Sequence, residues 1–586
     1  MCSLYTYVYL NQIRVVMQYC RPSSPLVSMM SPRCSKAASQ HYCPSSPVDS
    51  DCTVAVVKPK QLPGFKPLLK PHPPPPPPLL RSSTRQRSLA LQQRLRTTMA
   101  ASMPASPLRP LLLLLLAALA CHAADASWSG SPFRHGRGRG LGVNYGRVAD
   151  DIPTPRRSVQ LLRAAGAGSV KIYDANPAVL RALAGTGMAV SIMVPNQVIP
   201  DLAASYAAAD RWVAANLLPY LPRTRVKFLL VGNEVLSDGS IAASTWPRIV
   251  PAMENLHRSL RARRVSRVKL GTTLAMDALV AGAFPRPPSA AAFRPDIAES
   301  VLRPLLRFLE GTNSYYFVDA YTYFVWAGSN GTVPLDYALL QPATRARYVD
   351  PGTGLTYTNL LDEMLDAVGA AMSKLGHGGV RIAVAETGWP NGGDYDQIGA
   401  NVRNAAVYNR NLAARMARNP GTPARPGARM PVFVFSLYNE NLKPGPGTER
   451  HWGLYYPNGT AVYRVDLTGR RPLWAYPPLP APENDTPYKG QIWCVLAAHA
   501  GRKLNETAVG DALTYACGQG NGTCDAVQPG GECFQPNTGA AHASYAFNSY
   551  WQQFRKTGAT CYFNNLAEQT IKDPSHGSCK FRSSLG

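Results

Sequence analysis

Eight short runs rich in apolar residues alternate with longer stretches rich in Ala, Leu and Arg between residues 141 and 463. Apolar residues at consecutive positions are typical of strands buried on both faces, as in a parallel sheet. The runs cover 141–148, 169–174, 189–196, 226–234, 268–276, 315–323, 380–389 and 431–440, and the clearest helical intervals cover 151–165 and 359–375. Eight strands that alternate with helices predict an α/β fold, a (β/α)8 TIM barrel over residues 138–465.

An open, doubly wound sheet is the alternative architecture. Such a sheet carries a glycine-rich nucleotide loop directly after its first strand. The glycine run at 136–140 precedes the first apolar run instead. The glycine run is therefore interpreted as a flexible linker and not as a nucleotide loop, which favours the barrel over the open sheet.

Two of the apolar runs end in a glutamate. Glu234 closes the run Val-Lys-Phe-Leu-Leu-Val-Gly-Asn-Glu, and Glu386 follows Ile-Ala-Val-Ala and precedes Thr-Gly-Trp-Pro. The C-terminal ends of barrel strands are where this fold places its chemistry. Two carboxylates at that edge indicate the acid and nucleophile pair of glycoside hydrolysis. A helix cap is the alternative role for either glutamate, but the identical placement of two disfavours it.

Other strand ends carry aromatic and amide side chains, a mixture that carbohydrate sites use. Aromatic faces stack on sugar rings, and amides and carboxylates bind sugar hydroxyls. For a single tyrosine, packing under a loop is the alternative. The strand-end residues predicted to bind substrate are Tyr145, Tyr173, Asn233, Tyr323 and Trp389.

The formal charge of +26 is spread unevenly over the 586 residues. Residues 1–102 hold 13 Lys or Arg and only Asp49 and Asp51 as acids, which leaves +15 for the remainder. That remainder has no basic run interleaved with aromatic residues, so a nucleic-acid partner is not expected. A basic surface facing an acidic, pectin-rich matrix is the more natural use of such charge.

The first hundred residues do not have the composition of a folded domain. The stretch 1–98 includes the proline run 73–78 and scattered arginines, and it is predicted to be a disordered leader, an extension upstream of the true start at Met99 or Met103. Residues 99–126 have a basic start, an apolar core at 111–120 and small residues after it, which predicts a signal peptide. A genuine leader for an organelle is the alternative. We expect a secreted chain, with no integral membrane segment once mature.

Six cysteines crowd into the last hundred residues, and none lies between Cys121 and Cys494. Six cysteines in a small unit of a secreted chain predict three disulfides, with 15 possible pairings. No cysteine or histidine cluster has zinc-ligand spacing, and no metal or organic cofactor is expected. The unit is placed at 491–582, after a proline-rich stretch at 466–490 that predicts a semi-rigid linker. The sequons predicted to carry glycans are Asn330, Asn458, Asn505 and Asn521, whereas Asn484 is doubtful because Pro487 follows its threonine.

Five motifs in one order resemble the plant endo-β-1,3-glucanases of glycoside hydrolase family 17. They are Leu-Gly-Val-Asn-Tyr-Gly at 141–146, Lys-Ile-Tyr-Asp at 171–174, Val-Gly-Asn-Glu at 231–234, Ala-Glu-Thr-Gly-Trp-Pro at 385–390, and Phe-Ser-Leu-Tyr-Asn-Glu-Asn-Leu-Lys-Pro-Gly at 435–445. The resemblance covers most of residues 140–465. It implies that Glu234 is the acid/base and Glu386 the nucleophile.

The same resemblance implies supporting residues on the eighth strand and its loop. Glu440 and Lys443 correspond to the family's glutamate and lysine there, and Glu449 matches a further acidic position. One departure is visible, because the family usually has Tyr-Pro-Tyr-Phe at the sixth strand and this chain has Tyr-Thr-Tyr-Phe at 321–324. This difference affects the expected fine specificity and does not touch the two carboxylates.

The six-cysteine unit resembles carbohydrate-binding module family 43. The likeness rests on Trp-Cys-Val at 493–495, the cysteine spacing, Cys-Phe-Gln-Pro-Asn-Thr at 533–538 and Tyr-Ala-Phe-Asn-Ser-Tyr at 545–550. The pairing that it implies is Cys494–Cys561, Cys517–Cys524 and Cys533–Cys579.

The resemblance and the two carboxylates together imply a monomeric, retaining endo-hydrolase of β-1,3-glucan that is secreted to the cell wall, with callose as substrate. Glu386 would attack the anomeric carbon, and Glu234 would first protonate the leaving oxygen and then activate water. Asn233 is suited to hold the 2-hydroxyl. Two alternatives remain at this point: a transglycosylase that passes the same intermediate to a sugar, and a non-catalytic callose-binding wall protein that keeps the barrel as a scaffold.

Overall fold

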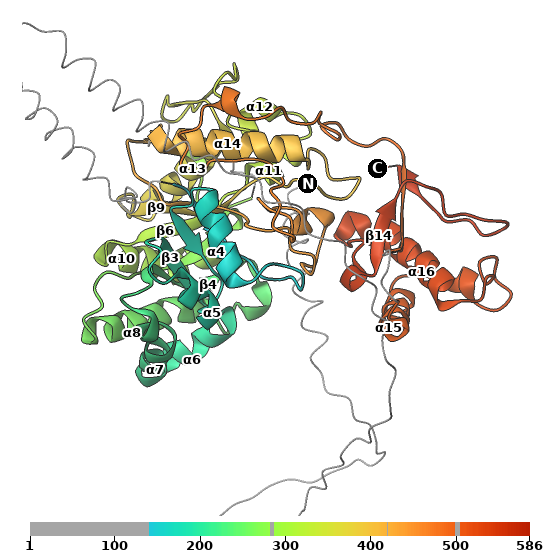
Figure 1. The fold of residues 1–586 in the computed structure, drawn as a ribbon, viewed down its shortest axis with the longest axis horizontal. Coiled ribbons are helices and arrows are strands. Elements are labelled where there is room, and N and C mark those ends of the chain that lie inside the picture. The colour runs from blue at the N-terminus through green and yellow to red at the C-terminus, as the bar shows by residue number, and fades with distance from the viewer. Residues whose placement is uncertain (1–139, 282–285, 419, 499–503, 586) are drawn as a thin grey trace, which may run out of the picture. The chain divides into compact units, whose positions relative to one another are not determined.

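The computed structural model describes residues 140–281, 286–418, 420–498 and 504–585 (Figure 1). The predicted leader at 1–98 and the predicted signal peptide at 99–126 lie outside the described residues. Within the described part, no helix is long and apolar enough to cross a membrane.

Eight parallel strands close into a barrel, in the order β1-β12-β9-β6-β5-β4-β3-β2. Each of the eight predicted apolar runs overlaps one of these strands, and closure of the sheet rules out the open, doubly wound alternative. The TIM-barrel prediction is therefore confirmed. The strands are β1 (Gly142–Asn144), β2 (Ser169–Lys171), β3 (Ala189–Val194), β4 (Arg225–Asn233), β5 (Lys269–Ala275), β6 (Tyr315–Asp319), β9 (Arg381–Thr387) and β12 (Val432–Val434).

Large side chains from the strands fill the inside of the barrel. Phe228 packs edge-on against Phe317, with ring centroids 5.1 Å apart, and both are buried. Glycine on a neighbouring strand makes room for such rings, because a Cβ at Gly142 would lie 2.3 Å from the Phe433 ring and one at Gly271 would lie 2.5 Å from the Phe317 ring. The barrel is thus a packed core, which leaves its rim as the place for a ligand.

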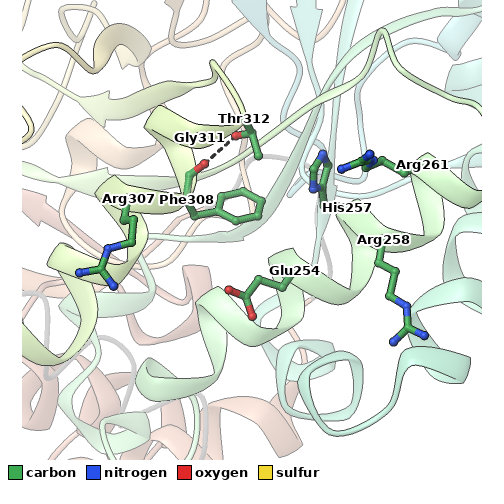
Figure 2. A pocket seen from close by; sticks show the side chains of 8 residues that line it. All are labelled: Glu254, His257, Arg258, Arg261, Arg307, Phe308, Gly311 and Thr312. Carbon is green, nitrogen blue, oxygen red and sulfur yellow. Dashed lines mark hydrogen bonds between the residues drawn. The ribbon is translucent and has the colours of Figure 1, made fainter.

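Helices surround the barrel. They include α4 (Pro155–Ala164), α8 (Ile249–Ala262), α10 (Arg303–Gly311), α13 (Leu360–Lys374) and α14 (Val402–Arg418). The helical intervals predicted at 151–165 and 359–375 contain α4 and α13. Helices α8 and α10 are neighbours in the outer layer, and a pocket opens between them (Figure 2).

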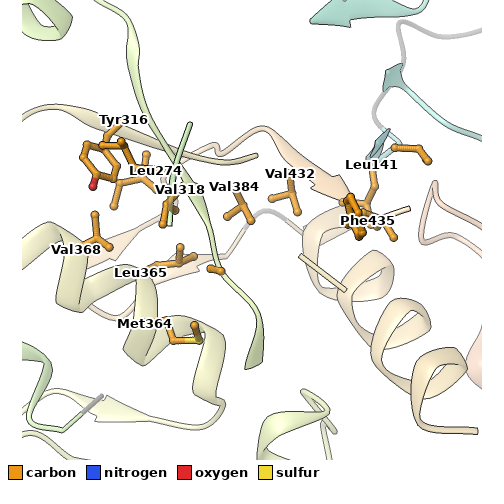
Figure 3. Close-up of a cluster of buried hydrophobic side chains, with 14 of the residues drawn as sticks. Leu141, Leu274, Tyr316, Val318, Met364, Leu365, Val368, Val384, Val432 and Phe435 are labelled. Atoms are coloured by element: carbon orange, nitrogen blue, oxygen red, sulfur yellow. The ribbon is translucent and has the colours of Figure 1, made fainter. Parts of the chain in front are cut away.

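The layer between strands and helices is apolar. Val318 and Val384 on adjacent strands face Leu365 and Val368 of α13 (Figure 3). Helix α13 begins sharply because the Asn359 side chain accepts a hydrogen bond from the Asp362 backbone N–H. This packing fixes the strands from outside and so holds the side chains at their C-terminal ends.

The proline-rich segment at 466–490, predicted to be a semi-rigid linker, makes hydrogen bonds to the barrel near its C-terminal end. The Asn484 carbonyl accepts a hydrogen bond from the Gly399 N–H at 2.7 Å, and Asn401 donates to the Asp485 carboxylate at 2.9 Å. This part of the segment is therefore bound to the barrel loop before α14. The half-buried Asn484 Nδ2 also donates to the backbone of Gln397 and Ala400, so the atom that a glycan would need is already engaged.

The C-terminal unit has its own small core. Strand β13 (Gln491–Leu496) pairs antiparallel with β14 (Ala567–Thr570) and β15 (Ser584–Leu585), and α15 (Glu506–Cys517) and α16 (Gly539–Phe554) pack beside them. Its disulfides are Cys494–Cys561, Cys517–Cys524 and Cys533–Cys579, the pairs that the resemblance implied. The core includes Trp493, Phe547 and Trp551, all nearly inaccessible to solvent. So few apolar side chains explain why a unit of this size needs covalent cross-links.

Candidate active site

A cleft of about 420 Å³ lies at the C-terminal ends of the barrel strands. Its lining contains most of the side chains that the sequence pointed to, brought together from five of the eight strands and the loops after them. The predicted residues in the lining are Tyr145, Tyr173, Asn233, Glu234, Glu386, Glu440, Lys443 and Glu449. Their convergence is what a single site for a large polar ligand requires.

Two predicted substrate contacts, Tyr323 and Trp389, are not in this lining, and the structure contradicts that role. Trp389 is inaccessible to solvent and donates its ring N–H to the Gly399 carbonyl at 2.8 Å. Tyr323 is 3% exposed and packs edge-on against Trp389. Tyr323 lies in helix α11 (Thr322–Ala327), which begins soon after β6, and both rings belong to the buried core. The aromatic faces that line the cleft beside Tyr173 are Tyr321, Phe324, Phe435 and Trp452.

Glu386, at the end of β9, is a buried carboxylate with three donors. Its Oε1 accepts from Lys171 Nζ and from the Tyr173 hydroxyl, each at 2.5 Å, and its Oε2 accepts from the Tyr321 hydroxyl at 2.6 Å. Burial alone would raise the pKa of Glu386, but the Lys171 ammonium and the two hydroxyls outweigh it and lower the pKa below its ordinary value. Glu386 is thus held ionised, as a nucleophile must be.

Lys171 is the functional residue that the strand pattern concealed. It is the last residue of β2 and lies inside the predicted apolar run 169–174, and its side chain is fully buried and forms an ion pair with Glu386. It also reaches Asn233 Oδ1 at 3.4 Å and lies 4.3 Å from the centre of the Tyr173 ring. A lysine inside an otherwise apolar strand was the available signal, because such a cation is buried only when it is paired.

Glu234 follows β4 in an unusual backbone conformation. Its φ is 47° and its ψ is 37°, in the left-handed region, and its N–H donates to the Thr273 carbonyl at 2.9 Å. Gly232, two residues earlier, also has a positive φ, and a Cβ there would lie 2.4 Å from Val235. The pairing of β4 with β5 shifts by a bulge before Asn233. Bulges and left-handed residues next to active sites re-aim a side chain, here the half-buried Glu234 that lines the cleft.

Hydrogen bonds hold both the side chain and the backbone of Asn233. Its Oδ1 accepts from the Thr273 hydroxyl at 2.9 Å, and its backbone N–H and C=O both bond to the Asn196 side chain. With the side-chain oxygen engaged in this way, the amide NH₂ is the group of Asn233 oriented for a ligand. Thr273 and Asn196 are therefore positioning residues for this amide.

Three charged residues on the loop after β12, Glu440, Lys443 and Glu449, also line the cleft. Glu440 accepts from the Val148 N–H at 2.7 Å, and Lys443 Nζ lies 3.5 Å from a Glu449 oxygen. Burial would lower the pKa of Lys443, but the carboxylates of Glu449, Glu440 and Glu386 raise it above its ordinary value. Gly146 leaves the space that Glu440 occupies, since a Cβ there would lie 2.3 Å from its carboxylate. This wall offers charged donors and acceptors to sugar hydroxyls.

Asp319 is a further carboxyl that sequence reasoning missed. It ends β6, is paired with Glu386 across the sheet, and is 2% exposed. Neither side-chain oxygen has a hydrogen-bond partner among the described residues. Burial first, and then the charge of Glu386, raise the pKa of Asp319 well above its ordinary value despite the opposing effect of Lys171. Because Asp319 is neutral, it does not compete with the Glu386 carboxylate for the Lys171 ammonium. The available signal was an acid directly after the apolar residues 315–318, within the run predicted at 315–323.

The arrangement provides one ionised carboxylate, a second carboxyl on a different strand, and aromatic and charged walls between which a polysaccharide can lie. Among the described residues, no group of three His, Cys, Asp or Glu side chains is placed to hold a metal ion. Acid and nucleophile chemistry at an acetal carbon needs no more than the two carboxyl groups.

Comparisons with known proteins cover both folded parts of the chain. A family model described as glycosyl hydrolases family 17 matches residues 141–467, and one described as X8 domain matches residues 492–568. The protein named probable glucan endo-1,3-beta-glucosidase A6, from Arabidopsis thaliana, is 49% identical over 445 residues, which cover 76% of this chain and 91% of that protein. Glucan endo-1,3-beta-glucosidase 13 from the same plant is 40% identical over 443 residues, covering 75% and 84%.

Among solved structures, one described as CJP38, a beta-1,3-glucanase and allergen of Cryptomeria japonica pollen, is 35% identical to this chain. The two structures agree with a TM-score of 0.52 over 56% of this chain and 99% of the other. The likeness therefore extends over the whole of that protein.

Proposed function

We propose that this chain, which belongs to the glycosyl hydrolases family 17, is a secreted, retaining endo-hydrolase of internal β-1,3-glucosidic bonds in callose-like glucan. It is a glycoside hydrolase, and its relatives are named for endo-1,3-β-glucosidase activity. The observation that carries the proposal is the Glu386 carboxylate, ionised by Lys171 and two tyrosine hydroxyls in the same cleft as Glu234.

The first step forms a covalent glycosyl-enzyme. A Glu386 oxygen attacks the anomeric carbon while Glu234 gives its proton to the departing glycosidic oxygen, so that the released chain leaves as an alcohol. Glu386 loses its negative charge when the ester forms. The second step reverses this, because Glu234, now ionised, removes a proton from water, and the water oxygen displaces Glu386.

The three donors to Glu386 act mainly on the second step. Hydrogen bonds and a cation that lower the basicity of a carboxylate also make it a better leaving group. Lys171, Tyr173 and Tyr321 stabilise the charge that returns to Glu386 as the ester breaks. Asn233, whose amide is held by Thr273 and Asn196, is placed to bind the 2-hydroxyl, a contact that strengthens in the transition state.

Product analysis on a soluble linear β-1,3-glucan tests the activity. An endo-acting hydrolase lowers the viscosity early, with few new reducing ends per chain, and yields mixed oligosaccharides without products longer than the starting chains. Cellulose, with β-1,4 bonds, is the matched control and stays intact. Early products longer than the substrate would show transfer to sugar as the main reaction, and an unchanged glucan would contradict catalysis.

The C-terminal unit, whose sequence matches the X8 domain model, is proposed to bind the same glucan. It has its own apolar core and three disulfides, and half-buried rings such as Tyr545 and Tyr550 lie at the edge of that core. Stacking on a sugar requires a ring face that the ligand can reach, which a half-buried ring at the edge of a core can present. Its role would be to keep the barrel on an insoluble polymer.

The expressed and oxidised fragment 485–586 should therefore sediment with insoluble β-1,3-glucan and not with cellulose. Reduction should abolish the binding, because the loss of disulfides from so small a unit costs about 2–5 kcal/mol. The measurement is the fraction of protein in the pellet, with the alkylated fragment as control. An oxidised fragment that stays in the supernatant with both polymers would contradict a targeting role.

Secretion is supported by the disulfides and by the sequons. Three disulfides in one unit suit an oxidising compartment. The asparagines at 330, 458, 505 and 521 are all exposed, as glycan acceptors must be. Intact-mass measurement of the secreted protein before and after glycan removal reports how many of the four are occupied.

A further inference from the structure

A second pocket, of about 430 Å³, lies on the outside of the barrel between α8 and α10. It is close to the C-terminal ends of both helices, since Arg261 and Thr312 belong to its lining. In a βα barrel the helices end where the next strands begin, so this pocket is at the opposite end of the barrel from the catalytic cleft. It is therefore a separate site.

The charged residues that line this pocket are mostly basic. His257, Arg258, Arg261 and Arg307 contribute to its lining, and Glu254 is the single acidic residue there (Figure 2). Within the described part of the chain, none of the three arginines forms an ion pair with a carboxylate. Arg258 lies against the Tyr206 ring, 4.3 Å from its centre. By contrast Arg263, outside the lining, is held by two hydrogen bonds to Asp210. The lining arginines thus keep donors available.

Helix stabilisation accounts for only part of this pattern. Cations in the last turn of a helix interact favourably with its dipole, and Arg261 is in the last turn of α8. Arg258 lies one turn earlier. Arg307 is in the middle of α10, whose last turn has no basic residue. Arg258 is placed by its contact with the Tyr206 ring, which leaves its N–H donors free of carboxylates, and Arg307 has no such partner among the residues that the structure describes.

Aromatic rings lie between the arginines. Phe308 is half-buried and packs edge-on against the His257 ring, with centroids 5.8 Å apart. Figure 2 shows Arg307 on one side of Phe308, and His257 and Arg261 on the other, with Arg258 and Arg307 extending away from each other. Burial, and then the charges of Arg261 and Lys269, lower the pKa of His257, so the positive charge of the pocket comes from the arginines and is independent of pH.

We propose that this pocket binds the carboxylate groups of an acidic polysaccharide, a polymer of uronic acid. A guanidinium fork matches a carboxylate with two parallel hydrogen bonds. The Phe308 ring provides an apolar face for the sugar that carries the carboxylate. Charges that are spread over two helices, rather than directed at one point, fit a chain with one carboxylate per sugar better than a single phosphate. The proposal does not depend on the activity of the cleft.

Binding of the full secreted chain to polygalacturonate at about 0.1 M salt tests the proposal, since this salt screens charges that are farther apart than about 10 Å. The variant Arg258→Gln/Arg261→Gln/Arg307→Gln should bind at least about tenfold more weakly than the wild type, because three charge-assisted contacts are lost. The matched control is Arg156→Gln/Arg163→Gln/Arg181→Gln, three exposed arginines on α4 and α5 (Pro177–Leu183), which removes the same charge elsewhere. The control should lose less than about threefold.

Further measurements test whether the guanidinium geometry, and not charge alone, is recognised, and whether the pocket is independent of the catalytic cleft. Fully methyl-esterified polygalacturonate, which has the same backbone without charge, should not bind. Replacing the same three arginines by lysine keeps the charge and should still weaken binding severalfold. Cleavage of neutral β-1,3-glucan should be unchanged in every variant. Equal losses in the pocket and control variants, full affinity of the lysine variant, or tighter pocket-dependent binding of double-stranded DNA than of polygalacturonate would overturn the proposal.

Discussion

Replacing Glu386 by Gln should lower kcat on β-1,3-glucan by at least about 10⁴-fold, as expected when a catalytic nucleophile is removed. The amide has the shape of the carboxylate but cannot form the glycosyl ester. It also leaves the buried Lys171 ammonium without its partner, so thermal unfolding must be measured beside the initial rate. Turnover near the wild-type value in a folded variant would contradict the assignment of Glu386.

Two further variants test the position of the Glu386 carboxylate and the role of Glu234 as the acid. Glu386→Asp keeps the ion pair possible but draws the nucleophile back, and a displacement of about 1 Å costs on the order of 10²-fold. Glu234→Gln should lower kcat by about 10²–10⁴-fold on glucan. On an aryl glucoside with a good leaving group the first step no longer needs an acid, so the Glu234 variant should release a burst of phenol, whereas the Glu386 variant should not.

Replacing Lys171 by Met should destabilise the protein by roughly 3–5 kcal/mol at neutral pH, because it leaves the buried Glu386 charge uncompensated. In the wild type the pKa of Glu386 is lowered, so the stability from this pair is complete above the ordinary pKa of about 4.5 and is lost as the pH falls through the lowered value. Without Lys171, burial raises the pKa of Glu386. The loss of stability should then be smallest at acidic pH, where Glu386 takes up a proton.

The same substitution should move the acid limb of activity to higher pH, because the nucleophile protonates earlier. The measurements are thermal unfolding and kcat/KM between pH 3 and 8. Lys171→Arg, which keeps the charge in a larger group, is the control and should keep the acid limb near its original place. An acid limb that is unmoved in the Met variant would show that Lys171 does not control Glu386.

The barrel could be predicted because its signals are local. Each strand lies in or overlaps a run rich in apolar residues, and such runs are typical of strands that are covered on both faces. Glu234 and Glu386 could be found for the same reason, since each is a polar residue at the end of such a run. The cysteine unit was equally visible, because cross-links substitute for a core that is too small.

The rest of the site depends on tertiary contacts. Lys171 was read as part of a strand, and only the closed sheet brings it to Glu386, which lies 215 residues later. Tyr321 and Tyr323 are two residues apart in one motif, yet the turn into α11 sends the first to the nucleophile and the second into the core beside Trp389. The segment around Asn484 has the composition of a linker, but its hydrogen bonds to the loop before α14 could be seen only in the fold.

The anomeric configuration of the first product distinguishes a two-step displacement at Glu386 from a single displacement by water. In a digest of linear β-1,3-glucan followed by proton NMR within the first minutes, we expect the new reducing ends to appear in the β configuration and to convert slowly to the equilibrium mixture. Two inversions at one carbon give this retention. New reducing ends that appear first in the α configuration would mean a single displacement by water and would contradict Glu386 as the nucleophile.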